Sequence, residues 1–237
     1  MKTKLTYLLL LFVVLSSCEE QDPELFNKEF LGQDGEYTFV TPDQYTGVPS
    51  SKRTSFFLDK FDNNVNNWGT VNDNDLFVNI ERGNLIFESK GPAYFTTITK
   101  PFDKSKDFEI ETSIKIVTGN SSLSANTNGF VWFVERTSNN RIASFNNFVF
   151  DDTRFWIGKY ESNNYRSWQN WTQSIIRSYG NYNKLTVRKI QNQYHFFVNE
   201  QFILSVPYEN RIGDRIGFRV KDKCRLEIDY LKIDYIN

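Results

Sequence analysis

Tryptophan and tyrosine side chains gather in the middle third of the sequence, between positions 132 and 171. The apolar faces of sugar rings stack on such side chains, while amide and guanidinium groups bind the sugar hydroxyls. Core packing is the competing interpretation, because aromatic side chains also fill the interiors of β proteins. We predict that this stretch binds a glycan, and we assign the contacts to Trp156, Tyr160, Trp168, Trp171, Arg154 and Arg166.

One pair of carboxylates could carry out acid–base chemistry. Glu109 and Glu111 stand two residues apart in an alternating segment, so both side chains point to one face of a strand. Such a pair can hydrolyse a glycosidic bond, but charged residues also line the solvent side of ordinary strands. His195 is the only histidine, and no Gly-x-Ser-x-Gly turn presents a serine nucleophile. We therefore predict no catalytic residue and keep Glu109 and Glu111 as the alternative.

Hard oxygen ligands for a cation occur near both ends of the expected domain, at Asp59, Asp62 and Asp229. Aspartate in turns caps backbone groups more often than it binds metal, and no Asp-x-Asp-x-Asp loop is present. A single histidine also argues against a zinc site of the usual kind. We predict no cofactor, and we keep a structural calcium ion at these three residues as the alternative.

The first eighteen residues have the order of an export signal. Lys2 and Lys4 precede an unbroken apolar run at residues 8–15, which is much shorter than the roughly 20 residues that a membrane helix needs. The run ends in Leu-Ser-Ser-Cys, which resembles the signal of bacterial lipoproteins, where the cysteine is acylated after cleavage. We predict that residues 1–17 are removed and that Cys18 carries the lipid.

A lipid at Cys18 predicts a protein anchored in the bacterial cell envelope, in the outer membrane. Three carboxylates follow within the next four residues, and such a run resembles the surface-export signal of some Gram-negative lipoproteins. A solvated tether is the competing interpretation of the same run. Once Cys18 is acylated, Cys224 is the only thiol left, so no intramolecular disulfide can form.

Length and composition limit the remaining classes. The chain of 237 residues suffices for one sizeable domain and a tail, and its 39% hydrophobic share excludes a disordered chain. The net charge of −1 excludes a basic field for nucleic acid. Proline, glycine and serine mark residues 18–55 as a tether, and residues 56–237 form the expected domain.

Side-chain alternation dominates the sequence from position 56 onward. Residues 108–116 place Phe108, Ile110 and Ile114 on one face, with charged residues between them. About a dozen such segments follow one another, separated by turn residues, and helical periodicity is absent outside the signal. We predict an all-β fold, an antiparallel two-sheet β-sandwich.

Several short motifs, taken in order, resemble the concanavalin A-like lectin and glucanase superfamily. They are FDNNVNNW at 61–68, IGKY at 157–160, NKLTVRKI at 183–190, YHFFVN at 194–199, GFRV at 217–220 and IDYLKI at 228–233, together with Trp168 and Trp171. The chain is most similar to the laminin-G-like jelly-roll domains of bacterial surface lipoproteins, and more distantly to sugar-hydrolase jelly rolls. The resemblance implies one convex and one concave sheet, with ligands on the concave face or its rim.

The resemblance also implies a pattern for catalytic members, in which the acids follow Glu-x-Asp-x-x-Glu. Glutamate stands here at the middle acid, Glu111, and Ile114 replaces the last one. We therefore predict noncatalytic binding of a polysaccharide or surface glycan. The alternatives are a glycan hydrolase or lyase that uses Glu109 or Glu111, and a structural or protein-interaction module of a surface complex.

Overall fold

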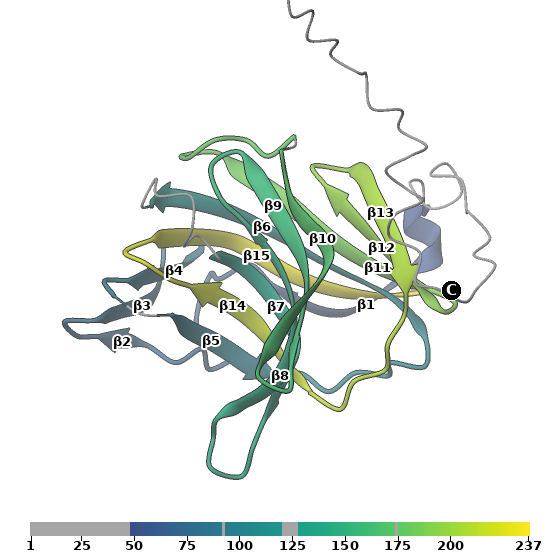
Figure 1. Ribbon diagram of the computed structural model, residues 1–237, viewed down its shortest axis with the longest axis horizontal. Coiled ribbons are helices and arrows are strands. Elements are labelled where there is room, and N and C mark those ends of the chain that lie inside the picture. Colours follow the sequence, from purple (N-terminus) through teal and green to yellow (C-terminus); the bar gives the residue numbers. More distant parts are fainter. Residues whose placement is uncertain (1–47, 92, 120–127, 174) are drawn as a thin grey trace, which may run out of the picture. The chain divides into compact units, whose positions relative to one another are not determined.

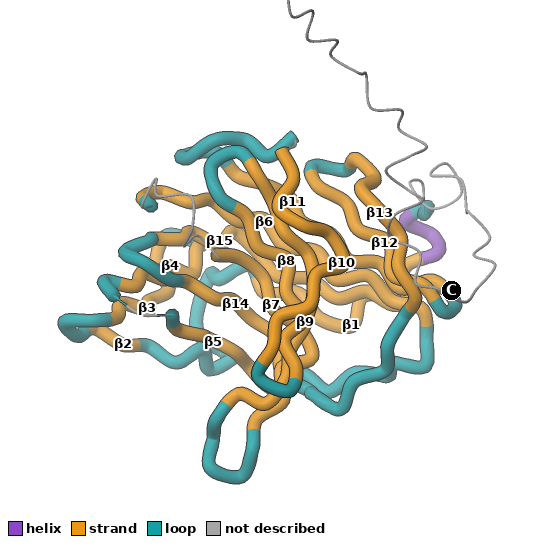
Figure 2. The backbone as a smooth tube through the Cα atoms, viewed as in Figure 1, coloured by secondary structure: helices purple, strands orange, loops and turns teal. Residues whose placement is uncertain are grey.

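The computed structural model describes residues 48–91, 93–119, 128–173 and 175–237 (Figure 1). Most of this part of the chain is β-strand (Figure 2). A single turn of 3₁₀ helix, η1 (Ser50–Lys52), precedes the strands β1 (Arg53–Asp59), β2 (Val71–Asn72), β3 (Leu76–Glu81), β4 (Asn84–Ser89), β5 (Tyr94–Thr99), β6 (Asp107–Thr118), β7 (Asn128–Arg136), β8 (Ile142–Phe150), β9 (Arg154–Glu161), β10 (Asn164–Gln173), β11 (Tyr182–Ile190), β12 (Gln193–Val198), β13 (Gln201–Pro207), β14 (Arg215–Val220) and β15 (Arg225–Ile236).

The strands form two antiparallel sheets. Sheet A has the order β13-β12-β11-β6-β15-β4-β3-β2, and β1 pairs with the second half of β15 beyond the end of β4. Sheet B has the order β10-β9-β8-β7-β14-β5. The prediction of an antiparallel two-sheet jelly-roll sandwich is therefore confirmed. The opening strand begins at Arg53 rather than at position 56, and Cys18 and most of the expected tether lie outside the described residues.

The main hydrophobic core joins side chains of both sheets. On β6 the predicted face is buried: Phe108, Ile110 and Ile114 have no exposed surface. From sheet B, Trp132 and Phe218 meet this face. A β-bulge in β7 gives Phe133 a φ of 53°, so two successive residues of that strand enter the same core.

The FDNNVNNW segment closes one end of this core. Phe61 and Trp68 are buried and pack edge to face, with ring centroids 5.6 Å apart, and Trp68 lies 5.7 Å from Phe218 of sheet B. Asp59 organises the segment by accepting hydrogen bonds from the Phe61 amide, the Asn66 amide group and the Trp68 indole, each at 2.8 Å. The motif thus has a structural role, because it holds a tryptophan between the sheets.

Sheet B carries a second, smaller hydrophobic cluster on the face turned away from sheet A. Val131, Val134 and Phe145 are its buried members. This face is strongly concave: the Arg219 guanidinium on β14 lies 5.4 Å from the Tyr165 ring on β10, although three strands separate them in the sheet. In a flat sheet, four strand spacings would hold them about 19 Å apart.

No helical segment among the described residues has the length and hydrophobicity to span a bilayer.

Candidate functional site

Five aromatic rings cover the concave face of sheet B, which we call the aromatic face. Phe145 and Tyr160 stack at 5.2 Å between centroids, and Tyr165 lies 4.9 Å from Tyr160. Phe95 approaches Phe145 to 5.2 Å from the opposite edge of the sheet, and Trp156 lies 6.2 Å from Tyr165. The rings contact one another, so they fill part of the concavity themselves.

Two buried polar side chains lie on the same face. Arg219 is 6% exposed, between the rings of Phe95 and Tyr165, and burial lowers its pKa. Asn147 is 1% exposed and stands between Val131 and Gly158 in the strand register. Both polar atoms of the Asn147 amide, and Nε and Nη1 of Arg219, find no hydrogen-bond partner among the described residues. Such groups are costly to bury unless water or a ligand satisfies them.

The six predicted glycan contacts do not share one surface. Trp156 and Tyr160 belong to the aromatic face, whereas Trp168 points into the main core, 5.8 Å from Tyr194 and 5.9 Å from Phe196. Tyr165 pairs with Tyr160 on the aromatic face, so strand alternation puts Trp168, three residues later, on the opposite face.

Of the remaining three predicted contacts, Arg154 shares the strand parity of Trp156, so it belongs to the same face of sheet B, together with Trp171. The Arg154 guanidinium is 5.0 Å from the Trp171 ring and is held by Asp151 through bonds of 2.6 and 3.0 Å. Arg166 is largely exposed, 3.7 Å from Glu161. Sequence reasoning missed Phe95, Phe145, Tyr165, Asn147 and Arg219. Strand alternation could have indicated Phe145 and Tyr165, but nothing local connects Phe95 or Arg219 to this face.

Glu109 and Glu111 share the face of sheet A that points away from the core, as predicted. Glu109 is 1% exposed, and its Oε2 accepts bonds from Arg188 Nε at 2.6 Å and from Arg53 Nη2 at 3.2 Å. A carboxylate clamped by two guanidinium groups is fixed as a buried ion pair, without room for a substrate atom. Of the two glutamates, Glu109 is therefore the less accessible to a substrate.

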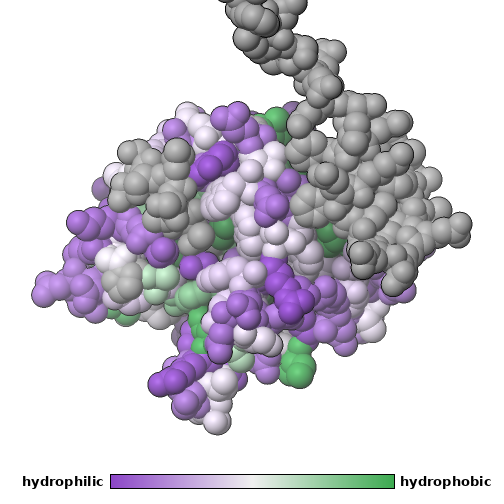
Figure 3. Space-filling model, in the orientation of Figure 1, coloured by the Kyte–Doolittle hydropathy of each residue, from purple (hydrophilic) through white to green (hydrophobic). Residues whose placement is uncertain are grey.

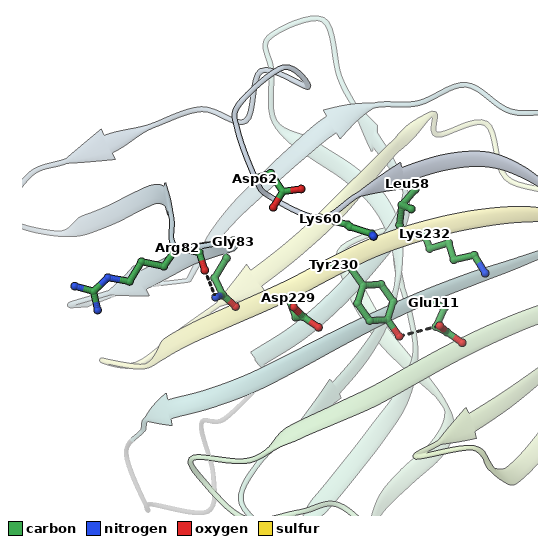
Figure 4. A pocket seen from close by; sticks show the side chains of 10 residues that line it. Leu58, Lys60, Asp62, Arg82, Gly83, Glu111, Asp229, Tyr230 and Lys232 are labelled. Carbon is green, nitrogen blue, oxygen red and sulfur yellow. Dashed lines mark hydrogen bonds between the residues drawn. The ribbon is translucent and has the colours of Figure 1, made fainter.

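Glu111 lines an open pocket of about 570 Å³ on that same face (Figure 4). Its Oε1 accepts a hydrogen bond from the Tyr230 hydroxyl at 2.8 Å, and its Oε2 lies 2.9 Å from Lys184 Nζ. Burial and the charge of Glu111 raise the pKa of Tyr230 well above its ordinary value, so this hydroxyl stays a donor. Burial opposes the charge of Lys184, but its bonds to Glu111 and Glu200 raise its pKa overall.

A second carboxylate, Asp229, lines the same pocket. It follows Ile228 at a register irregularity of β15, which places it beside Tyr230 at the pocket wall. Figure 4 shows the Tyr230 ring lying between Asp229 and Glu111. The other lining residues are mostly charged or polar: Lys60, Asp62, Arg82, Asn84 and Lys232, with Leu58 and Gly83.

The three candidate calcium ligands are divided between two places. Asp62 and Asp229 line the pocket, whereas Asp59 is buried and engaged by the loop that follows it. Among the described residues, no three His, Cys, Asp or Glu side chains gather closely enough to hold a metal ion. The calcium alternative stays a prediction without a ligand set.

Neither a protein-family model nor a curated protein sequence matches the chain. Solved structures do share its fold. The catalytic domain of an endo-1,3-β-glucanase (laminarinase) from Thermotoga petrophila is 10% identical with a TM-score of 0.53, covering 78% of this chain and 98% of its own. A β-glucanase from Bacillus licheniformis is 11% identical with a TM-score of 0.55, covering 76% and 97%. An endo-β-1,3-glucanase from Pyrococcus furiosus is 10% identical with a TM-score of 0.52, covering 78% and 95%.

The domain therefore has the concanavalin A-like, glucanase-type jelly-roll fold, as the sequence motifs predicted. The comparison corrects the prediction of a noncatalytic binding role. The solved structures with this fold include glucanases and a catalytic domain, so it favours the hydrolase alternative instead.

Proposed function

We propose that the domain hydrolyses a glycan, with Glu111 and Asp229 as its two carboxylates. One observation carries the proposal: both carboxylates line a single open pocket, on either side of the Tyr230 ring (Figure 4). The ring offers an apolar surface on which a sugar can stack, and the charged side chains around it offer partners for hydroxyl groups. The glucanases that share the fold support β-glucans as the first substrates to test.

The surroundings of the two carboxylates suit different roles. Glycoside hydrolysis needs one ionised carboxylate as nucleophile or base, and one carboxylic acid that protonates the leaving oxygen. Glu111 suits the ionised role, because Lys184 and the Tyr230 hydroxyl both stabilise its negative charge. Asp229 is exposed at the wall of the pocket, and it is the second carboxylate left for the proton-donor role. This reaction needs no cofactor.

Substitution of each carboxylate tests the assignment. Release of reducing ends from laminarin and from mixed-linkage β-glucan is compared between the unaltered protein and Glu111→Gln, Asp229→Asn and Glu81→Gln. We expect each of the first two changes to lower kcat at least about 100-fold, since general acid–base groups contribute about that much or more. Glu81 is exposed at the end of β3 and serves as the matched control, with kcat unchanged.

Equal thermal unfolding midpoints establish that the variants are folded. Unchanged turnover in both Glu111→Gln and Asp229→Asn would refute the assignment. Failure of the unaltered protein to cleave any polysaccharide in a panel of neutral and acidic glycans would refute the function itself.

We also propose that this activity is located at the bacterial outer membrane, with the domain tethered through a lipid on Cys18. The support is the order of basic residues, apolar run and Leu-Ser-Ser-Cys at the start of the chain. Acyl chains on one cysteine would hold the domain at the membrane through burial of their methylene groups.

A further inference from the structure

A second pocket, of about 290 Å³, lies at the β5 edge of sheet B. Its polar lining consists mainly of Arg136 and Asn140, at the β7–β8 hairpin, and Arg215 on β14. The hairpin projects at the bottom of Figure 1, and its tip carries hydrophilic side chains in Figure 3. Val71, Leu76 and Phe95 form an apolar wall of the pocket. The pocket is separate from the one that holds Glu111.

The two arginines of this pocket are neighbours. Arg215 pairs with Val134 in the register of β14 and β7, and Arg136 follows two residues later on β7, on the same face. Burial and the positive charge of Arg215 together lower the pKa of Arg136. The fold therefore holds two like charges close together, which is unfavourable unless an anion lies between or beside them.

No carboxylate of the described residues compensates these charges. None of the salt bridges in the described part of the chain includes Arg136 or Arg215. Arg136 Nη1 donates to the Asn140 carbonyl at 2.9 Å, which orients the guanidinium, but its buried Nε finds no partner there. Arginine presents several N–H donors in a fixed plane, so two adjacent guanidinium groups match the oxygens of one anionic group.

We propose that Arg136 and Arg215 bind the anionic group of an acidic saccharide. The shared chemistry is an oxyanion, either the carboxylate of a uronic acid or a sulfate ester, with the sugar ring against Phe95 and Leu76. The two arginines indicate that the ligand carries an anionic group. That the ligand is a saccharide rests on the proposed function.

Calorimetric titration with three oligosaccharides of equal length tests the proposal: an oligogalacturonate, a sulfated galactan fragment and a neutral galactan fragment. We expect at least one acidic oligosaccharide to bind at least tenfold more tightly than the neutral one. Its affinity should fall when salt is added. The stronger of the two acidic ligands identifies the source of the anion. The titration measures binding and not hydrolysis. Its result therefore stands even if the domain proves to have no hydrolase activity.

Variants locate the binding. Arg215→Gln should lower the affinity for the acidic oligosaccharide at least tenfold. Arg136→Lys should lower this affinity less, because lysine keeps the charge but lacks the planar donors. Arg141→Gln is the matched control: it removes an exposed arginine from the same hairpin, outside the pocket, and should change the affinity less than twofold. Equal affinity for acidic and neutral ligands, no binding of either, or unchanged affinity in Arg215→Gln would overturn the proposal.

Discussion

Glu109 and Glu111 show how neighbours give two identical side chains different roles. Both lie on the outer face of β6, two residues apart. Arg188 and Arg53 enclose Glu109, so its charge is held in a buried ion pair with two guanidinium groups. Glu111 shares its charge between Lys184 and Tyr230, and still faces an open pocket. The difference comes from the surrounding strands β1, β11 and β15, and not from β6 itself.

His195 belongs to the same face, and its titration gives a prediction at this scale. Its Nδ1 lies 2.6 Å from Ser205 Oγ, and burial, followed by the charge of Arg188, lowers its pKa to about 4 from an ordinary 6.5. Between these two pH values the unfolded chain takes up a proton that the folded chain refuses. Folding stability is therefore lost as the pH falls from 6.5 through 4, by roughly 3 kcal/mol in all.

Urea denaturation at a series of pH values measures this effect. In His195→Gln the free energy of unfolding should fall less steeply between pH 6.5 and 4 than in the unaltered protein. The difference in slope should correspond to close to one proton fewer taken up on unfolding. Carboxylates titrate in both proteins, so the difference between the two curves isolates the histidine. Parallel curves would contradict the prediction.

At the scale of elements, the curvature and register of sheet B determine what each strand presents. A bulge in β7 turns Phe133 into the main core, against simple alternation. The concavity brings the Arg219 side chain of β14 to the Tyr165 ring of β10, across three strands. Gly217 in β14, between β5 and β7, has no room for a side chain, because the backbone of β5 lies too close to its Cα.

Gly217→Ala should destabilise the domain strongly. An added Cβ would lie 2.1 Å from the Thr96 carbonyl oxygen. That oxygen belongs to the backbone of β5, so it cannot move away without distorting the sheet. We expect a loss of about 2–4 kcal/mol in the free energy of unfolding, in the range of severe packing changes. Gly69→Ala is the matched control, because its Cβ would meet no atom within 4 Å. Equal denaturant midpoints for the two variants would show that β14 accommodates the methyl group.

At the scale of the whole molecule, the domain carries two separate pockets. One lies on sheet A around Tyr230, and the other at the edge of sheet B around Arg136 and Arg215. A polymer longer than a few sugars can contact more than one surface of such a domain. The expected export signal at residues 1–17 and the lipid expected on Cys18 would determine where in the cell the domain meets such a polymer.

Metabolic labelling tests the lipid anchor. Cells that express the full chain are grown with an alkyne analogue of palmitate, and the protein is expected to be labelled and to fractionate with the outer membrane. Cys18→Ser should abolish labelling, because no other residue accepts the acyl group in this signal, while Cys224→Ser should leave it intact. Mass spectrometry that finds an unacylated, uncleaved N-terminus would exclude the anchor.

Local patterns sufficed for the class of fold and for much of the core. Alternation along 108–116 predicted which side chains of β6 are buried and that its two glutamates share a face, because successive residues of a strand point to opposite sides. The turn-separated segments predicted two antiparallel sheets. Among the aromatic residues, strand parity was right for Trp156 and Tyr160, whose strand β9 pairs with β8 without interruption.

Tertiary structure alone decided the sites. Arg136 and Arg215 are 79 positions apart, and Glu111 and Asp229 are 118 apart, yet strand pairing puts each pair at one pocket. A bulge turned Phe133 into the core, and neighbouring arginines enclosed Glu109. A sequence records the side to which a residue points, but its neighbours across the sheet depend on register and curvature, which arise only when the strands pair.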